Sequence, residues 1–202
     1  MRLPVLALAA APALLAAPGQ ALPEALTAQL KATPFLRVDF QQTRTLAALS
    51  RPLKSSGSLV VSREQGVIWA MAKPMALTVV VSPKGVLEVD AEGRKKLQTS
   101  KDTPMVAQMA RIMKSLLEGQ WSALDDLFSV TGATRPEGKW TILLAPKPRT
   151  AAFLKAVRIQ GGRFIETIHV TEASGDATDL VFVNPRVDVP LTPAELRLFS
   201  FE

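Results

Sequence analysis

The sequence contains no cysteine and no tyrosine, and it has a single histidine, His169. Without cysteine the chain has no disulfide, no thiolate metal ligand and no cysteine that could carry a lipid anchor. His169 lies in a stretch of alternating residues, and the sequence has neither an HExxH-type pair nor a Gly-x-Ser-x-Gly turn. Gln160-Gly161-Gly162 lacks the lysine and the helix that follow a phosphate-binding loop. We therefore expect no metal site, no cofactor and no enzymatic activity.

Aromatic residues are also scarce, at 5% of the chain, and the basic residues are scattered along it. A surface that binds nucleic acid would combine stacking side chains with a lysine and arginine patch, so this class of partner is not expected. The net charge of +6 would then favour anionic lipid head groups or acidic protein partners. With 48% hydrophobic and 21% charged residues, the composition is that of a folded chain.

Residues 1–21 have the features of a secretory signal. An early arginine precedes an Ala/Leu-rich run, and small residues precede a cleavage position after Ala21. A membrane anchor is the alternative, but the run is short for a bilayer span and is interrupted by Pro4, Pro12 and Pro18. We expect a Sec signal peptide and a periplasmic protein in which residues 22–202 form one domain.

The stretch 57–74, GSLVVSREQGVIWAMAKP, predicts a β-hairpin. Its two apolar runs flank a polar loop that ends in Gly66, a residue suited to positive φ. Alternation or short apolar runs between turn residues predict further strands at 35–41, 77–81, 86–89, 94–98, 128–131, 140–145, 152–159, 164–170 and 180–183. We expect a mainly β domain of about eleven antiparallel strands. Pro185, Pro190 and Pro193 argue against a long regular element before 195–201.

Two segments show helical spacing instead. Residues 22–31 place leucines four apart, and Thr103-Pro104 begins a second amphipathic stretch over 105–118 whose apolar stripe is rich in methionine. The stripe fits core packing, and it also fits a cover over variable apolar ligands, because the methionine side chain adapts to irregular space.

Several short motifs resemble the LolA family, the periplasmic carriers of outer-membrane lipoproteins. They are Phe40-Gln41-Gln42, Pro52-Leu53, Gly57-Ser58-Leu59, Arg63, Trp69 and Lys73-Pro74, followed by the helical insertion and the later strands in the same order. The resemblance implies a half-open antiparallel β-barrel covered by short helices, with an apolar cavity for acyl chains. It also implies that Arg63, in the hairpin loop, hydrogen-bonds the helical lid and helps to keep the empty cavity shut.

The resemblance assigns the apolar cavity to inward positions of the first strands and of the second helix. The candidate ligand-binding residues are Val38, Phe40, Leu59, Val61, Trp69, Met71, Leu77, Val79, Met109, Ile112, Met113 and Leu116. Trp69 and Met71 could be sealed core or cavity wall, and Arg63 could simply be a solvated turn residue. Trp140 is expected in the core.

The expected partners are an acylated lipoprotein or lipid cargo, an inner-membrane transporter as donor and an outer-membrane acceptor, and the expected state is a monomer. The sequence ends soon after Phe199-Ser200-Phe201, whereas lipoprotein carriers of this family usually continue into a further loop and strand. Tyrosine and tryptophan are also few. Both departures leave open a carrier of free fatty acid or glycolipid for a dedicated exporter, a periplasmic lipid or lipoprotein sensor, and a barrel filled by its own side chains.

Overall fold

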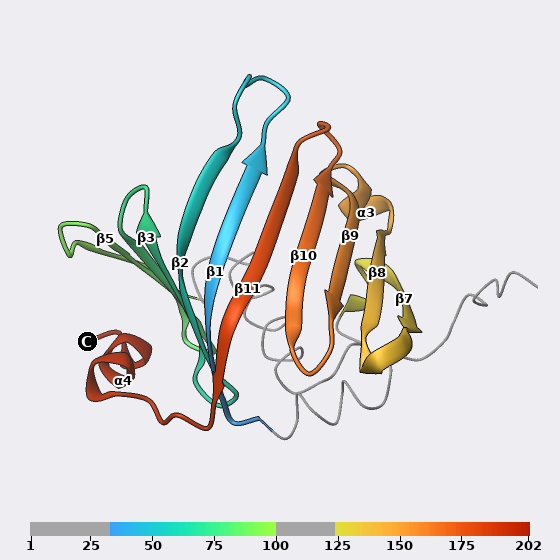
Figure 1. Cartoon of the computed structure of the whole chain (residues 1–202). Coiled ribbons are helices and arrows are strands. Elements are labelled where there is room, and N and C mark those ends of the chain that lie inside the picture. The colour runs from blue at the N-terminus through green and yellow to red at the C-terminus, as the bar shows by residue number, and fades with distance from the viewer. Residues whose placement is uncertain (1–32, 100–123) are drawn as a thin grey trace, which may run out of the picture.

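The computed structural model describes residues 33–99 and 124–202 (Figure 1). The strands are β1 (Phe35–Thr45), β2 (Leu53–Ser62), β3 (Gly66–Lys73), β4 (Leu77–Ser82), β5 (Gly85–Asp90), β6 (Lys95–Thr99), β7 (Phe128–Thr134), β8 (Trp140–Pro146), β9 (Leu154–Gly161), β10 (Ile165–Glu172) and β11 (Ala177–Val187). The same part of the chain contains three short helices: η2 (Pro136–Gly138), α3 (Pro148–Ala151) and α4 (Pro193–Ser200).

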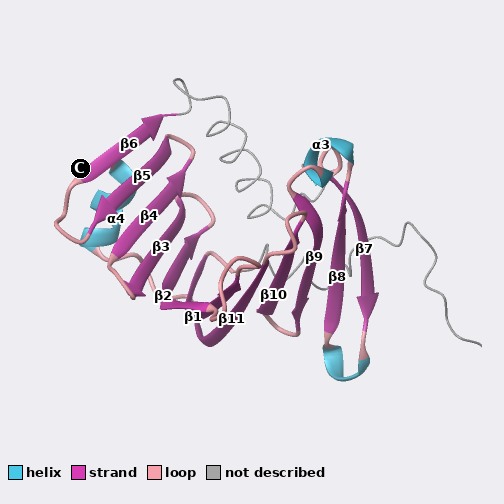
Figure 2. Ribbon diagram, turned by 90° about the horizontal axis from the view of Figure 1, so that it is seen from above, coloured by secondary structure: helices cyan, strands magenta, loops and turns pink. Residues whose placement is uncertain are grey.

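All eleven strands belong to one antiparallel sheet, in the order β6-β5-β4-β3-β2-β1-β11-β10-β9-β8-β7. The sheet is not closed, since β6 and β7 are its two edges. Seen from above, it curves so that β2–β6 and β7–β10 form two facing halves joined by β1 and β11 (Figure 2). The predicted mainly β, half-open antiparallel architecture is therefore confirmed. The predicted signal peptide and the predicted helices over 22–31 and 105–118 lie outside the described residues.

The hairpin predicted at 57–74 is present as β2 and β3. Gly66 closes it with φ of 119°, and an added Cβ there would lie 2.1 Å from the backbone oxygen of Val81, so only glycine fits. In the loop, the Arg63 amide donates to the Pro34 carbonyl at 3.1 Å and the Gln65 amide to Ser62 Oγ at 3.2 Å. These bonds fix the turn that carries Arg63.

Two predicted boundaries are wrong because of local proline chemistry. Residues 152–153 precede β9 rather than belonging to it, since Pro148 starts the helical turn α3. Pro185 does not interrupt β11, which continues to Val187. A bulge at this point places Asn184 and Pro185 opposite the single residue Val38, and Asn184 takes φ of 55°. Proline is tolerated there because a bulge position makes no regular ladder bond.

The C-terminal helix α4 packs on the outer face of β2–β5. Thr192 and Glu195 form a capping box at its start, and Pro193 occupies the first turn. Phe199, only 2% exposed, completes a cluster with four buried residues of the sheet, Val60, Ile68, Val80 and Leu87. The helix therefore overlaps the element expected at 195–201, and it begins two residues earlier because Pro193 occupies its first turn.

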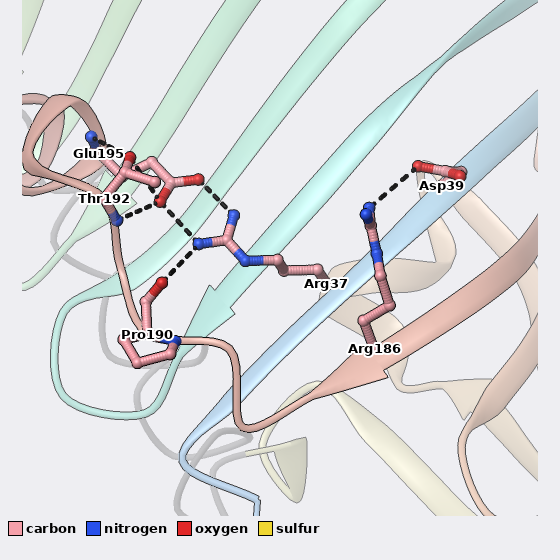
Figure 3. Close-up of polar contacts among 6 residues, drawn as sticks. All are labelled: Arg37, Asp39, Arg186, Pro190, Thr192 and Glu195. Atoms are coloured by element: carbon pink, nitrogen blue, oxygen red, sulfur yellow. Dashed lines mark hydrogen bonds and ion pairs between the residues drawn. The ribbon is translucent and has the colours of Figure 1, made fainter.

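A bidentate salt bridge between Arg37 and Glu195 attaches α4 to the central strand β1. Arg37 donates from Nη1 to Glu195 Oε1, and from Nη2 to Glu195 Oε2 at 2.7 Å and to the Pro190 carbonyl at 2.9 Å (Figure 3). The two side chains are only 13% and 16% exposed. The hydrogen bond from Arg37 lowers the pKa of Glu195 from 4.5 to about 2, with help from Thr192 and against the opposing effect of burial.

Glu195→Gln should lower the free energy of unfolding by roughly 1–3 kcal/mol at neutral pH, because it removes charge-assisted bonds and leaves the Arg37 guanidinium half-satisfied. Since the folded-state pKa of Glu195 is depressed, this difference in the free energy of unfolding between the wild type and the variant is fully present above pH 4.5. It becomes smaller as the pH falls towards 2. Urea denaturation from pH 3 to pH 7 measures this deficit. Glu92→Gln, in a pair that is 65–76% exposed, is the control and should change little. An equal effect of both variants would contradict the anchoring role of Arg37–Glu195.

Candidate functional site

The concave face of the sheet is defined by strand register, because residues directly opposite each other in antiparallel strands point to the same face. Val38 lies opposite Leu59, Leu59 opposite Trp69, and Trp69 opposite Val79. This row crosses β1 to β4 on the face opposite to α4. Among the described residues, no helix packs on this face of β2–β5.

The eight predicted ligand-binding residues of the strands all lie on the concave face by this register. They are Val38, Phe40, Leu59, Val61, Trp69, Met71, Leu77 and Val79. The rings of Phe40 and Trp69 contact each other with centroids 4.4 Å apart, and Gly57, the β2 residue opposite Phe40, has no side chain to separate them. The other four candidates, Met109, Ile112, Met113 and Leu116, lie outside the described residues. Ligand binding by the whole set stays a prediction.

The concave face continues across the junction into the second half. Phe40 lies opposite Phe182, and the register carries the face through β10 and β9 to β8. Here it holds the other core cluster, made of buried Leu124, Phe128, Trp140, Ile142, Leu144, Val157 and Ile159. Trp140 is 4% exposed, so its predicted place in the core is confirmed.

The outer face of the second half is polar by comparison. His169, on β10, lies between Arg158 and Asp179, and its Nδ1 is 2.6 Å from Asp179 Oδ1. Both members of this pair are about half exposed. The sheet therefore has one face that is apolar across both halves and another that is apolar only beneath α4.

A pocket of about 410 Å³ opens at the end of the concave face where β10 separates from β11. β11 pairs with β1 as far as Val187, but its pairing with β10 extends only from Ala177 to Val181. The pocket is lined by Val38, Arg163, Phe164, Ile165, Glu166, Phe182, Pro185 and Val187. Its volume lies in the range of small-molecule sites, and six of its eight lining residues are apolar.

The β9–β10 turn that borders this pocket is held by buried contacts. Trp140 Nε1 donates to the Gly162 carbonyl at 2.6 Å, and the Gly162 amide donates to the Phe164 carbonyl at 3.1 Å. An added Cβ at Gly161 would lie 2.1 Å from the Phe164 carbonyl oxygen and 2.7 Å from the Trp140 ring. The turn therefore presents Arg163 and Phe164 from a fixed backbone, and the Arg163 guanidinium lies 5.4 Å from the Phe164 ring centroid.

Of the predicted ligand-binding residues, Val38 alone lines this pocket. The sequence did not single out Phe182, Ile165, Val187 or Arg163, although Leu180 and Phe182 alternate within a predicted strand. What placed them at the site is the pairing of β11 with β1, strands at opposite ends of the described chain. Arg63 lies in the β2–β3 loop as expected, half-buried, but its predicted partner, the lid over 105–118, lies outside the described residues.

The described part of the chain offers no group of three or more histidine, cysteine, aspartate or glutamate side chains suited to a metal ion. None of the helices that the structure describes has the length and hydropathy needed to cross a bilayer.

The half-open sheet with an apolar concave face is the architecture of LolA-like proteins. The model of the family described as outer membrane lipoprotein carrier protein LolA matches residues 32–202, so the chain belongs to the LolA family. A search of curated proteins gives no match.

Solved structures with a similar fold share little sequence with this chain. A LolA superfamily protein from Nitrosomonas europaea has 7% identity and a TM-score of 0.46, covering 86% of this chain and 94% of that one. A putative outer membrane lipoprotein-sorting protein domain from Vibrio parahaemolyticus has 10% identity and a TM-score of 0.46, covering 87% and 94%. The lipoprotein LppX from Mycobacterium tuberculosis has 7% identity and a TM-score of 0.46, covering 84% and 94%.

Trp140→Phe should lower the free energy of unfolding by about 1–3 kcal/mol, because the buried Gly162 carbonyl loses its donor. Trp69→Phe is the matched control, since it removes a similar ring from a half-buried position on the concave face. Thermal and urea denaturation of both variants measure the difference. If Trp140→Phe cost no more than Trp69→Phe, the indole hydrogen bond would not be what holds the turn.

Proposed function

We propose that this chain is a periplasmic carrier that binds acyl chains on its concave face and passes an acylated cargo from the inner to the outer membrane. The observation that carries the proposal is the continuity of the apolar concave face across both halves of the sheet. On the first half no described helix packs on this face, whereas α4 covers the outer face of the same strands.

The energetics of such a face suit a carrier. Burial of each methylene is worth about 0.8 kcal/mol, so one long acyl chain brings on the order of 10 kcal/mol before ordering costs. Half-buried valine, leucine and methionine side chains provide this contact without hydrogen-bonding groups that would have to be desolvated. Membership of a family described as outer membrane lipoprotein carriers supports the same class of cargo.

The transfer of cargo between two membranes defines the partners that the protein needs. A carrier between two membranes requires a donor at the inner membrane and an acceptor at the outer membrane. A periplasmic sensor would bind the same ligand but change its affinity for one partner protein instead of losing the ligand to acceptor membranes. Transfer of cargo to vesicles therefore separates the two.

Leu59→Asn should weaken binding of a fluorescent fatty-acid analogue by on the order of tenfold, because its amide would be desolvated against the acyl chain. Val181→Asn is the matched control: Val181 is 40% exposed and, opposite Thr167, lies on the outer face. Fluorescence titration measures both affinities, and circular dichroism checks that the variants are folded. If the wild-type protein bound no analogue, the concave face would be filled by the protein itself and the carrier proposal would fail.

Release of cargo requires an empty state of comparable free energy, and we assign Arg63 to its stabilisation. Guanidinium hydrogen bonds worth about 1.5–3 kcal/mol each would be sufficient to bias such an equilibrium. Arg63→Leu should therefore bind the fatty-acid analogue more tightly and transfer it more slowly to acceptor vesicles. Arg149→Gln, an exposed change on α3, serves as the control. Unchanged binding and unchanged transfer in Arg63→Leu would exclude this role.

A further inference from the structure

The pocket between β10 and β11 combines an apolar floor with one uncompensated positive charge. Val38, Phe182 and Val187 are among its apolar lining residues, and Arg163 and Glu166 are its only charged lining residues among those that the structure describes. These two charges are not equivalent. Glu166 forms an ion pair with Lys139 Nζ, whereas Arg163 makes no ion pair with any described residue.

Two other carboxylates lie near this end of the sheet: the first is paired, and the second lies outside the pocket. Asp39, on the outer side of β1, lies 3.9 Å from Arg186 Nη2 (Figure 3). It also accepts a hydrogen bond from Asn184 Nδ2 at 3.0 Å. Asp188, one residue beyond Val187, does not line the pocket. The Arg163 guanidinium is therefore the group available to an anion that enters this pocket.

The backbone holds Arg163 in place at the border of the pocket. Gly162 precedes Arg163, and its carbonyl is held by the Trp140 indole. Phe164 follows Arg163, and its ring lies against the guanidinium. Since the turn is already ordered, little backbone entropy is lost when a ligand engages it. On the other side of the pocket, Phe182 lies opposite Phe40, so the apolar surface continues from the floor onto the concave face.

The geometry points to a binding site for a single-chain anionic lipid: the acyl chain lies along the floor of Val38 and Phe182, and its carboxylate or phosphate pairs with Arg163. A volume of about 410 Å³ is at the low end of small-molecule sites and fits one chain better than a bulky head group. The guanidinium suits both anions because its planar fork donates two parallel hydrogen bonds. This inference rests on the proposed function and specifies the class of its ligand.

The test compares cis-parinaric acid with its methyl ester, which carries the same chain without the charge, by fluorescence titration of the wild-type protein. The acid should bind about two- to fivefold more tightly than the ester, as expected for a partly exposed charge pair. Arg163→Gln should remove this preference and leave the affinity for the ester unchanged. Arg158→Gln, which removes an exposed arginine from the outer face of the same half, should keep the preference. Raising the salt concentration should reduce the advantage of the acid but not the binding of the ester.

The source of the anion is settled by competition. Oleic acid and 1-oleoyl lysophosphatidic acid share one chain, so the better competitor shows whether a carboxylate or a phosphate is preferred, and neutral monooleoylglycerol should compete least. If acid and ester bound equally, or if Arg163→Gln weakened the binding of both alike, Arg163 would not be a head-group site. Binding of the acyl chain by the apolar surface would still be supported. If neither probe bound, the proposed function itself would fail.

Discussion

The constraint behind this structure is that a single sheet of eleven strands has two faces to cover, and that the described helices available to cover them are short. Each half has one buried apolar cluster, but the two clusters lie on different faces. In β2–β5 the cluster lies on the outer face, where Phe199 of α4 completes it and the Arg37–Glu195 bridge attaches the helix. In β7–β9 the cluster lies on the concave face and includes Leu124. The strands β2–β4 thus already have a buried cluster on their outer face, and their concave face is apolar as well. This second apolar face is the one that a ligand can use.

Alternation along the strands made much of this arrangement predictable. Val38, Leu59, Trp69 and Val79 were each placed inward from their own strand, and the register shows them in one row. Side-chain alternation is a property of each strand by itself, so it does not depend on the order of the strands in the sheet. The approximate number of strands and their antiparallel arrangement could be predicted from the turn residues between them for the same reason.

What could not be predicted depended on contacts distant in sequence or on a proline in an unusual setting. Phe182 and Arg163 reach the pocket because β11 returns to pair with β1, a pairing that no local pattern encodes. Pro185 was interpreted as a barrier, but the bulge opposite Val38 accommodates it within β11. Pro193 is also a poor guide to the structure from its residue type alone. With Thr192 before it and Glu195 after it, it occupies the first turn of α4, a position where proline is tolerated.

The placement of the two cores on separate halves also has a mechanical consequence. Neither of the two buried clusters found among the described residues spans the junction of β1 and β11, where the strands, of 11 residues each, are joined by a long ladder of backbone hydrogen bonds. Such a ladder resists slipping of its register but twists and bends at modest cost. A change in the width of the space between the halves would therefore bend this ladder, and it would leave the packing inside each of the two clusters as it is.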